Sequence, residues 1–327
     1  MRTQRRRLVL AGCGALLTLP AAALSPNHYR LGVLSIDDNP VDPIWIEFLL
    51  EMARLGLAEG DDFTTVPSFV GRDGKSALRA AEDLVSQNVD AIYVSGGTAV
   101  VKAAMQATST IPIVMFTAAD PVRDGLVASL RRPGGNVTGN AILAPELLAK
   151  RLQILVEITH RPRRVAFLTT SSSPIATRPE MREALDKTSR SVGTSAQVFQ
   201  VASIEELDST IAEIGRAGLP LVADVTALFY INVKRLGALV AQNRIAAIGD
   251  GKRYAEAGFL VSYGLDYHDL VRRCARLIAK IFKGADPGKL PVELASKFEL
   301  VVNLRSAADL GITVPRNYRS AATAILR

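Results

Sequence analysis

The sequence has few of the residue types on which metal sites and nucleophilic enzymes most often depend. Its 327 residues contain three histidines, two cysteines and one tryptophan. His28, His160 and His268 are far apart, and neither an HExxH nor a CxxC spacing occurs. A Gly-x-Ser-x-Gly elbow and a Walker phosphate loop are also missing. These absences argue against an enzyme, and we expect no metal and no cofactor.

The shortage of cysteine also excludes a disulfide framework. Cys13 lies in the first, apolar segment, so Cys274 is the only cysteine in the rest of the chain. Cys274 sits in a helical pattern of apolar and arginine residues. We expect a buried structural thiol rather than a nucleophile.

The positive charge is concentrated at the N-terminus. The formal net charge is +7, and Arg2, Arg5, Arg6 and Arg7 supply four of these charges, which leaves +3 for the remainder. A nearly neutral remainder is poor support for nucleic-acid binding. We therefore expect no nucleic-acid partner.

Residues 1–25 have the pattern of an export signal. The arginines precede a short apolar stretch, and Ala21-Ala22-Ala23 fits the rule for signal cleavage. The apolar stretch is too short for a comfortable membrane span, although an uncleaved anchor is the alternative. The arginine cluster allows a twin-arginine route, and Leu10-Ala11-Gly12-Cys13 allows lipidation at Cys13. The prediction is a periplasmic protein whose signal is cleaved near Ala23.

Strand-like and helix-like segments alternate after residue 28. Short β-branched apolar runs predict buried parallel strands, and the amphipathic stretches between them predict helices. The expected strands are 29–36, 63–67, 91–95, 111–116, 164–169, 197–201, 220–223, 246–249 and 298–303. The expected helices are 43–57, 76–88, 98–108, 144–158, 178–192, 204–216, 231–242 and 267–283. This alternation predicts an α/β fold of two lobes with parallel sheets.

An ordered set of short motifs covers nearly the whole chain after the N-terminal segment. The most distinctive is Arg-Pro-Gly-Gly-Asn-Val-Thr-Gly at 132–139, which follows an apolar strand and a Thr-Ala-Ala-Asp-Pro turn. The other segments are 31–35, 55–60, 96–99, 109–114, 120–122, 256–258, 262–264, 290–293 and 297–303. With these motifs the chain resembles bacterial ABC-transporter substrate-binding proteins of the type I periplasmic-binding fold. It looks most like the branch with tryptophan- and other amino-acid-binding members.

The resemblance implies two Rossmann-like lobes joined by three crossings of the chain. These crossings are expected near Asn140, Gly251 and Lys289. Lobe one would then comprise 28–140 plus 252–285, and lobe two 141–251 plus 286–327. The resemblance also implies that a ligand binds between the lobes and that hinge closure holds it there.

Candidate ligand-binding residues follow the strands of each lobe, because open parallel sheets bind ligands beyond the carboxyl ends of their strands. In lobe one they are Ser35, Asp37, Asp38, Gly97, Thr98, Thr117 and Asp120. In lobe two they are Ser172, Ser173, Asp224, Thr226 and Asp250. The hydroxyls would bind a carboxylate and the aspartates an ammonium group. The alternative roles are helix caps, turn residues or hinge hydrogen bonds.

The predicted function is the solute-binding component of an ABC importer. It would capture a small polar solute, an amino acid or related carboxylate, and present the closed form to a membrane permease as a monomer. The alternative is a periplasmic sensing subunit for a signalling partner. A sugar-binding-type transcription regulator shares the fold but would need a DNA-binding segment where this chain has its export signal.

Overall fold

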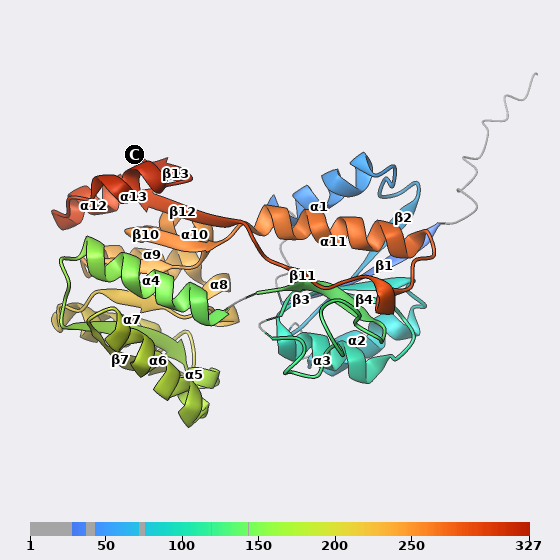
Figure 1. Ribbon diagram of the computed structural model, residues 1–327, viewed down its shortest axis with the longest axis horizontal. Coiled ribbons are helices and arrows are strands. Elements are labelled where there is room, and N and C mark those ends of the chain that lie inside the picture. The colour runs from blue at the N-terminus through green and yellow to red at the C-terminus, as the bar shows by residue number, and fades with distance from the viewer. Residues whose placement is uncertain (1–27, 37–42, 72–75, 119, 143) are drawn as a thin grey trace, which may run out of the picture.

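The chain forms two lobes, each built on its own sheet (Figure 1). The computed structural model describes residues 28–36, 43–71, 76–118, 120–142 and 144–327. The predicted export segment therefore lies outside the described residues. Within the described residues, no helix is long and apolar enough to cross a membrane.

Lobe one contains a six-stranded sheet whose neighbouring strands all run parallel. Its strands, in order across the sheet, are β11 (Glu293–Leu294), β5 (Val137–Ala141), β4 (Ile113–Ala118), β3 (Ala91–Ser95), β1 (Tyr29–Ser35) and β2 (Phe63–Phe69). Its helices are α1 (Pro43–Arg54), α2 (Ala77–Ser86), α3 (Thr98–Ala107) and α11 (Tyr267–Phe282), with a short 3-10 turn at Pro287–Lys289.

Lobe two contains a seven-stranded sheet that is parallel except where β10 meets β12. Its strands, in order across the sheet, are β13 (Ala324–Leu326), β12 (Phe298–Asn303), β10 (Val261–Leu265), β9 (Ala247–Gly249), β8 (Leu221–Ala223), β6 (Arg164–Thr170) and β7 (Ser195–Val201). Its helices are α4 (Ala144–Ile158), α5 (Pro174–Thr177), α6 (Pro179–Ser191), α7 (Leu207–Arg216), α8 (Ala227–Ile231), α9 (Val233–Gln242), α10 (Gly251–Glu256), α12 (Leu304–Leu310) and α13 (Arg316–Ala321).

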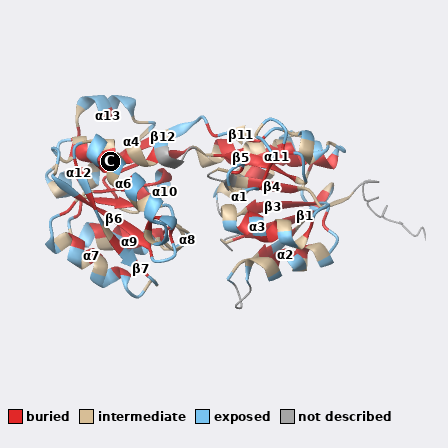
Figure 2. Cartoon of the chain, turned by 60° about the horizontal axis from the view of Figure 1, so that its bottom comes forward, coloured by how far each residue is buried: buried red, intermediate tan, exposed pale blue. Residues whose placement is uncertain are grey.

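The hydrophobic core lies on both faces of each sheet, where the helices cover it (Figure 2). The strands are buried because their runs of Val, Ile and Leu face helices on both sides. This explains why the alternation in the sequence predicts the α/β fold correctly. Trp45 stacks on Phe48 with ring centroids 4.6 Å apart, which places it in the apolar stripe of α1.

The Gly-rich motif at 132–139 leads into a strand of the lobe-one sheet. Its last residues belong to β5, which is buried along its whole length. Gly139 has φ +136°, and a Cβ there would lie 2.1 Å from the Met115 carbonyl oxygen on β4. Glycine is required at this position because any side chain would separate the two strands.

The chain crosses between the lobes between β5 and α4, between β10 and α11, and after β11. Two of these crossings differ from the predicted positions near Gly251 and Lys289. Residues 252–265 include α10 and β10 and belong to the second sheet, whereas 286–294 belong to lobe one. The prediction near Gly251 followed from the family resemblance, which does not fix where in this chain the crossing falls. Only the pairing of β10 with β9 and β12 shows that lobe two continues.

Helix α11 is tied to lobe one and to the third crossing by ion pairs. Arg272 and Arg276 bind Glu47 and Glu51 of α1, with N–O distances of 3.0 and 2.7 Å. Asp269, in the first turn of α11, accepts hydrogen bonds from Arg273 and from Lys297 in the crossing segment. These contacts hold the crossing segment against the end of α11.

Asp269 makes part of the stability depend on pH. Burial raises the pKa of its carboxyl, but the hydrogen bonds from Lys297 and Arg273 outweigh it, and the pKa lies below its usual value. The stabilisation is therefore complete above the unfolded-state pKa of about 3.9 and is lost as pH falls through the lower folded-state value.

We expect Asp269→Asn to lower the free energy of unfolding at pH 7 by about 1.5–3 kcal/mol. The variant should also lose less stability than the wild type between pH 5 and 3 in urea titrations. Asp186→Asn, which removes an exposed pair with Arg182, is the control, and an equal loss in both variants would contradict this role.

Candidate functional site

The carboxyl ends of both parallel sheets face each other across the gap between the lobes. β5 leaves lobe one at its carboxyl end and leads directly into α4 of lobe two, and β1, β3 and β4 run parallel to β5. β10 likewise leads from lobe two into α11, and β6, β8 and β9 run parallel to β10. Figure 1 shows the resulting arrangement, in which the strand ends of each lobe point to the other. We call the two sets of strand ends the lobe-one edge and the lobe-two edge.

On the lobe-one edge, the start of α3 presents backbone rather than side-chain groups. Gly97 is the N-cap of α3 with φ +74°, and no side chain caps the helix there. The first N–H groups of a helix without a cap are available to an anion. The Thr98 hydroxyl donates to Asp124 at 3.3 Å, and Ser35 is buried at the end of β1. The donors that this edge offers are therefore the backbone N–H groups at the start of α3.

Asp120 serves as a turn residue, which is one of the two roles that the sequence allows. Its carboxylate accepts a hydrogen bond from the Arg123 backbone N–H at 3.0 Å, and its side chain is 45% exposed. It closes the turn after β4 and makes its contacts locally. Asp37, Asp38 and the side chain of Thr117 lie outside the described residues.

On the lobe-two edge, Asp224 forms the centre of a cluster of hydroxyl groups. Thr169 and Ser173 donate to one carboxylate oxygen at 2.5 and 2.8 Å, and the Val225 N–H donates to the other at 2.8 Å. All three donors are neutral, and no Lys or Arg among the described residues forms an ion pair with Asp224. The arrangement keeps a carboxylate in place without neutralising its charge.

The other lobe-two candidates have mixed roles. Ser173 and Thr226 cap the short helices α5 and α8, because their hydroxyls accept from Ile175 and Phe229 N–H. Ser172 is exposed and contacts Thr170 through its hydroxyl at 3.3 Å. Of this group, Ser172 has the side chain most accessible to a ligand.

Two residues that the sequence analysis did not select belong to helices that follow strands of the lobe-two edge. The Arg253 guanidinium, in the first turn of α10, stacks over the Tyr230 ring of α8 at 4.4 Å. Both helices begin directly after strands of the lobe-two edge, at β9 and β8. A cation on an aromatic ring and an aspartate on the same edge together have the chemistry to hold a zwitterion. Neither residue belongs to a motif, so only the fold brings them together.

Both carboxylate oxygens of Asp250 are bonded to side chains at the crossings between the lobes. One of its carboxylate oxygens accepts from the Arg151 guanidinium and the other from the Tyr267 hydroxyl. The side chains of Asp250 and Arg151 are each 5% exposed. Arg151 lies on α4 and also donates from Nε to the Tyr263 carbonyl at 2.7 Å. A Cβ at Gly264 would lie 2.2 Å from the Asp250 carboxylate, so this network requires glycine at 264.

The hinge network joins the two lobes because Tyr267 begins α11 of lobe one, whereas Asp250 and Arg151 belong to lobe two. Burial, followed by the charge of Asp250, raises the pKa of the Tyr267 hydroxyl well above its usual value. Tyr267 therefore remains a neutral donor. The sequence does contain one sign that Arg151 is buried. It lies four residues after Leu147, on the apolar face of α4.

Two further features concern catalysis. Among the described residues, no group of three or more His, Cys, Asp or Glu side chains is placed to hold a metal ion. Cys274 is buried as predicted, and burial raises the pKa of its thiol well above its usual value. Its sulfur contacts Asn140 and the Met115 carbonyl in the interior of lobe one, so it packs as a structural residue.

A model of the family "ABC transporter substrate binding protein" matches residues 63–325, which span both lobes. The chain belongs to this family. Substrate-binding proteins of ABC transporters bind solutes, work outside the cytoplasm and are not enzymes as a family. The type I periplasmic-binding fold predicted from the motifs is thereby confirmed.

The proteins to which this substrate-binding protein is similar include one that is named for binding tyrosine and one that was solved with L-Trp. A tyrosine-binding protein of Clostridioides difficile is 24% identical over 287 residues, which cover 85% of this chain and 80% of that protein. A Streptococcus pneumoniae domain solved in complex with L-Trp has a TM-score of 0.78 and 22% identity, and the match covers 92% of this chain and all of that one. A ligand-free, open substrate-binding protein with adhesive properties from Clostridium difficile has a TM-score of 0.66 and 20% identity, covering 91% and 99%. At these identities the solved structures establish the shared fold.

Proposed function

We propose that this substrate-binding protein is the extracytoplasmic solute-binding component of an ABC importer and that its solute is an amino acid or a related carboxylate. The solute would lie between the lobe-one and lobe-two edges. The observation that carries this proposal is Asp224, a carboxylate fixed by three neutral donors and without a cationic partner among the described residues. An ammonium group of the solute would supply the missing positive charge.

The groups around Asp224 complement the rest of an amino acid. The uncapped start of α3 at Gly97 and the hydroxyl of Ser172 offer donors to a carboxylate, and the Arg253 guanidinium adds a positive charge to the lobe-two edge. The Tyr230 ring provides an aromatic surface for a side chain. Relatives with tyrosine or L-Trp in their descriptions support an amino-acid solute.

Closure follows from ligand contacts with both edges. A solute that touches only one lobe would bind the open and closed forms equally and would not change the equilibrium between them. A solute held by Asp224 of lobe two and Gly97 of lobe one stabilises the closed form by the difference in affinity. The closed form would then dock on the membrane permease.

A ligand screen by thermal shift tests the proposal. Residues 26–327 are mixed with amino acids, nucleosides, sugars and small carboxylates, and the apparent melting temperature is recorded. A ligand at 100 times its Kd stabilises the folded protein by about 2.7 kcal/mol. We expect a selective shift with one or a few α-amino acids. A shift confined to sugars or nucleosides would refute the amino-acid assignment, and uptake assays in cells lacking the gene would test the importer role.

A further inference from the structure

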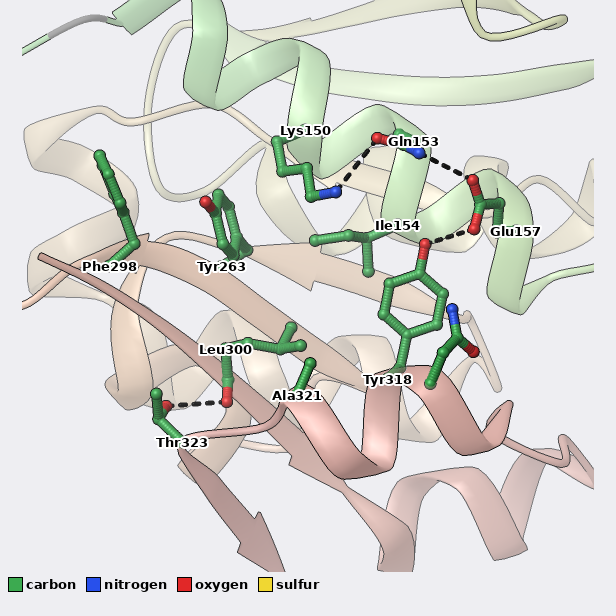
Figure 3. Close-up of a pocket in the computed structure, with 11 residues that line it drawn as sticks. Lys150, Gln153, Ile154, Glu157, Tyr263, Phe298, Leu300, Tyr318, Ala321 and Thr323 are labelled. Carbon is green, nitrogen blue, oxygen red and sulfur yellow. Dashed lines mark hydrogen bonds between the residues drawn. The ribbon is translucent and has the colours of Figure 1, made fainter.

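A second groove lies on lobe two, between α4 and α13 and above β10 and β12 (Figure 3). Its volume is about 410 Å³, within the range of small-molecule sites. It is lined by Lys150, Gln153, Ile154, Glu157, Tyr263, Phe298, Leu300, Asn317, Tyr318, Ala321 and Thr323. None of these residues is a candidate for the site between the lobes, so the groove is a separate feature.

Two aromatic rings form an open wall of the groove. Tyr263 on β10 and Phe298 on β12 stack with centroids 6.1 Å apart and an interplanar angle of 20°. Phe298 is 39% exposed, which is unusual for a large apolar side chain at the start of a central strand. Ile154 and Leu300 are buried and provide an apolar floor. The wall can receive another flat ring by offset stacking.

A chain of hydrogen bonds along α4 fixes the polar side of the groove. Lys150 donates to the Gln153 side-chain oxygen at 3.2 Å, and the Gln153 amide nitrogen donates to Glu157 at 2.9 Å. The Tyr318 hydroxyl donates to the second Glu157 oxygen at 2.5 Å. The hydrogen bond from Tyr318, followed by that from Gln153, lowers the pKa of the Glu157 carboxyl. Glu157 is thus an anion whose two oxygens already have donors.

Among the groups in this series of hydrogen bonds, the Lys150 ammonium has N–H groups that are not yet donated. Its ammonium can donate three hydrogen bonds, and among the described residues it makes one, to a neutral amide oxygen. No carboxylate of the described residues lies within ion-pair distance of it. The groove therefore combines a stacked aromatic wall with a partly buried cation that forms no ion pair among the described residues, although the Glu157 anion lies in the same groove (Figure 3).

We propose that this groove binds a small planar aromatic anion of the aryl-carboxylate class. The ring lies against Tyr263 and Phe298, and the carboxylate accepts from Lys150. A cationic ligand would meet the Lys150 charge, and a saturated ring would lose the stacking contact. The site would make the protein respond to a second molecule that is not the transported solute.

Calorimetric titration with benzoate, benzamide and cyclohexanecarboxylate tests this proposal. We expect benzoate to bind with a 1:1 stoichiometry and at least tenfold more tightly than the other two. Lys150→Met and Phe298→Ala should each weaken benzoate binding at least tenfold, while their thermal unfolding and amino-acid response stay close to the wild type. Asp224→Asn, at the other site, should leave the benzoate affinity unchanged.

Four outcomes would overturn the proposal. One is no heat of binding with benzoate, and another is benzoate binding that persists in both groove variants. The third is benzoate binding lost in Asp224→Asn, because this places benzoate between the lobes. If sedimentation instead shows self-association that Phe298→Ala abolishes, a second copy of the chain covers the groove and the ligand assignment is wrong. The amino-acid screen of the wild-type protein uses neither benzoate nor the groove variants, so a failure of this proposal can be distinguished from a failure of the proposed function.

Discussion

Replacing Arg151 with methionine is expected to lower the free energy of unfolding by about 3–5 kcal/mol. The substitution preserves most of the volume of the side chain but leaves the Asp250 carboxylate buried without its cation. Removing one partner of a buried ion pair is costly because the remaining charge has lost its water and its counter-charge. Urea unfolding at pH 7 measures the effect.

The matched control for Arg151 is Arg235→Met. Arg235 pairs with Asp208 at 2.9 Å, but both side chains are about half exposed, so the loss should stay below about 1 kcal/mol. In the double variant Arg151→Met with Asp250→Asn, part of the stability should return, because no buried charge remains. A loss in Arg151→Met no larger than in Arg235→Met would show that the hinge network contributes little.

Replacing Asp224 with asparagine is expected to weaken binding of the solute roughly 10- to 100-fold, the range for one charge-assisted hydrogen bond. Asparagine has nearly the same shape, and its side-chain oxygen can still accept from Thr169 and Ser173. The amide nitrogen replaces the oxygen that accepts from the Val225 N–H, so one local hydrogen bond is lost, but the two bonds from Thr169 and Ser173 should keep the lobe-two edge folded. Most of the loss in affinity should come from the missing negative charge. Calorimetric titration with the amino acid selected in the thermal-shift screen measures it.

Asp120→Asn is the control for Asp224→Asn. Asp120 closes an exposed turn next to the lobe-one edge and makes its contacts with Arg123 and Asp124 locally. We expect its affinity to stay within twofold of the wild type. If Asp120→Asn weakened binding and Asp224→Asn did not, the ammonium group would have to lie on lobe one, and the proposed orientation of the solute would be reversed.

Much of the fold could be predicted because its signals are local. Each buried parallel strand is a short run of β-branched residues, and each helix between the strands has an apolar stripe. The same locality placed Gly97, Thr98, Asp224 and Thr226 at strand ends. In a parallel sheet the strand ends share one edge, so their order along the chain predicts that they come together.

The roles of these residues could not be predicted in the same way. Asp224 and Asp250 both follow short apolar strands, and nothing local distinguishes them. The structure separates them by their partners, which come from distant parts of the chain. Asp250 meets Arg151, 99 positions away, and Asp224 meets only hydroxyl and N–H donors.

The sequence by itself determined the alternation of strands and helices, the strand ends at which we propose that the solute binds, and the motifs of the substrate-binding family. These depend on interactions between residues close together in the chain. Only the tertiary structure decided that β10 belongs to lobe two, that Asp250 is part of the hinge, and that Lys150, Tyr263 and Phe298 share one groove. Those contacts join different secondary-structure elements, up to the 99 positions between Arg151 and Asp250, and their free energy appears only when the sheets have formed.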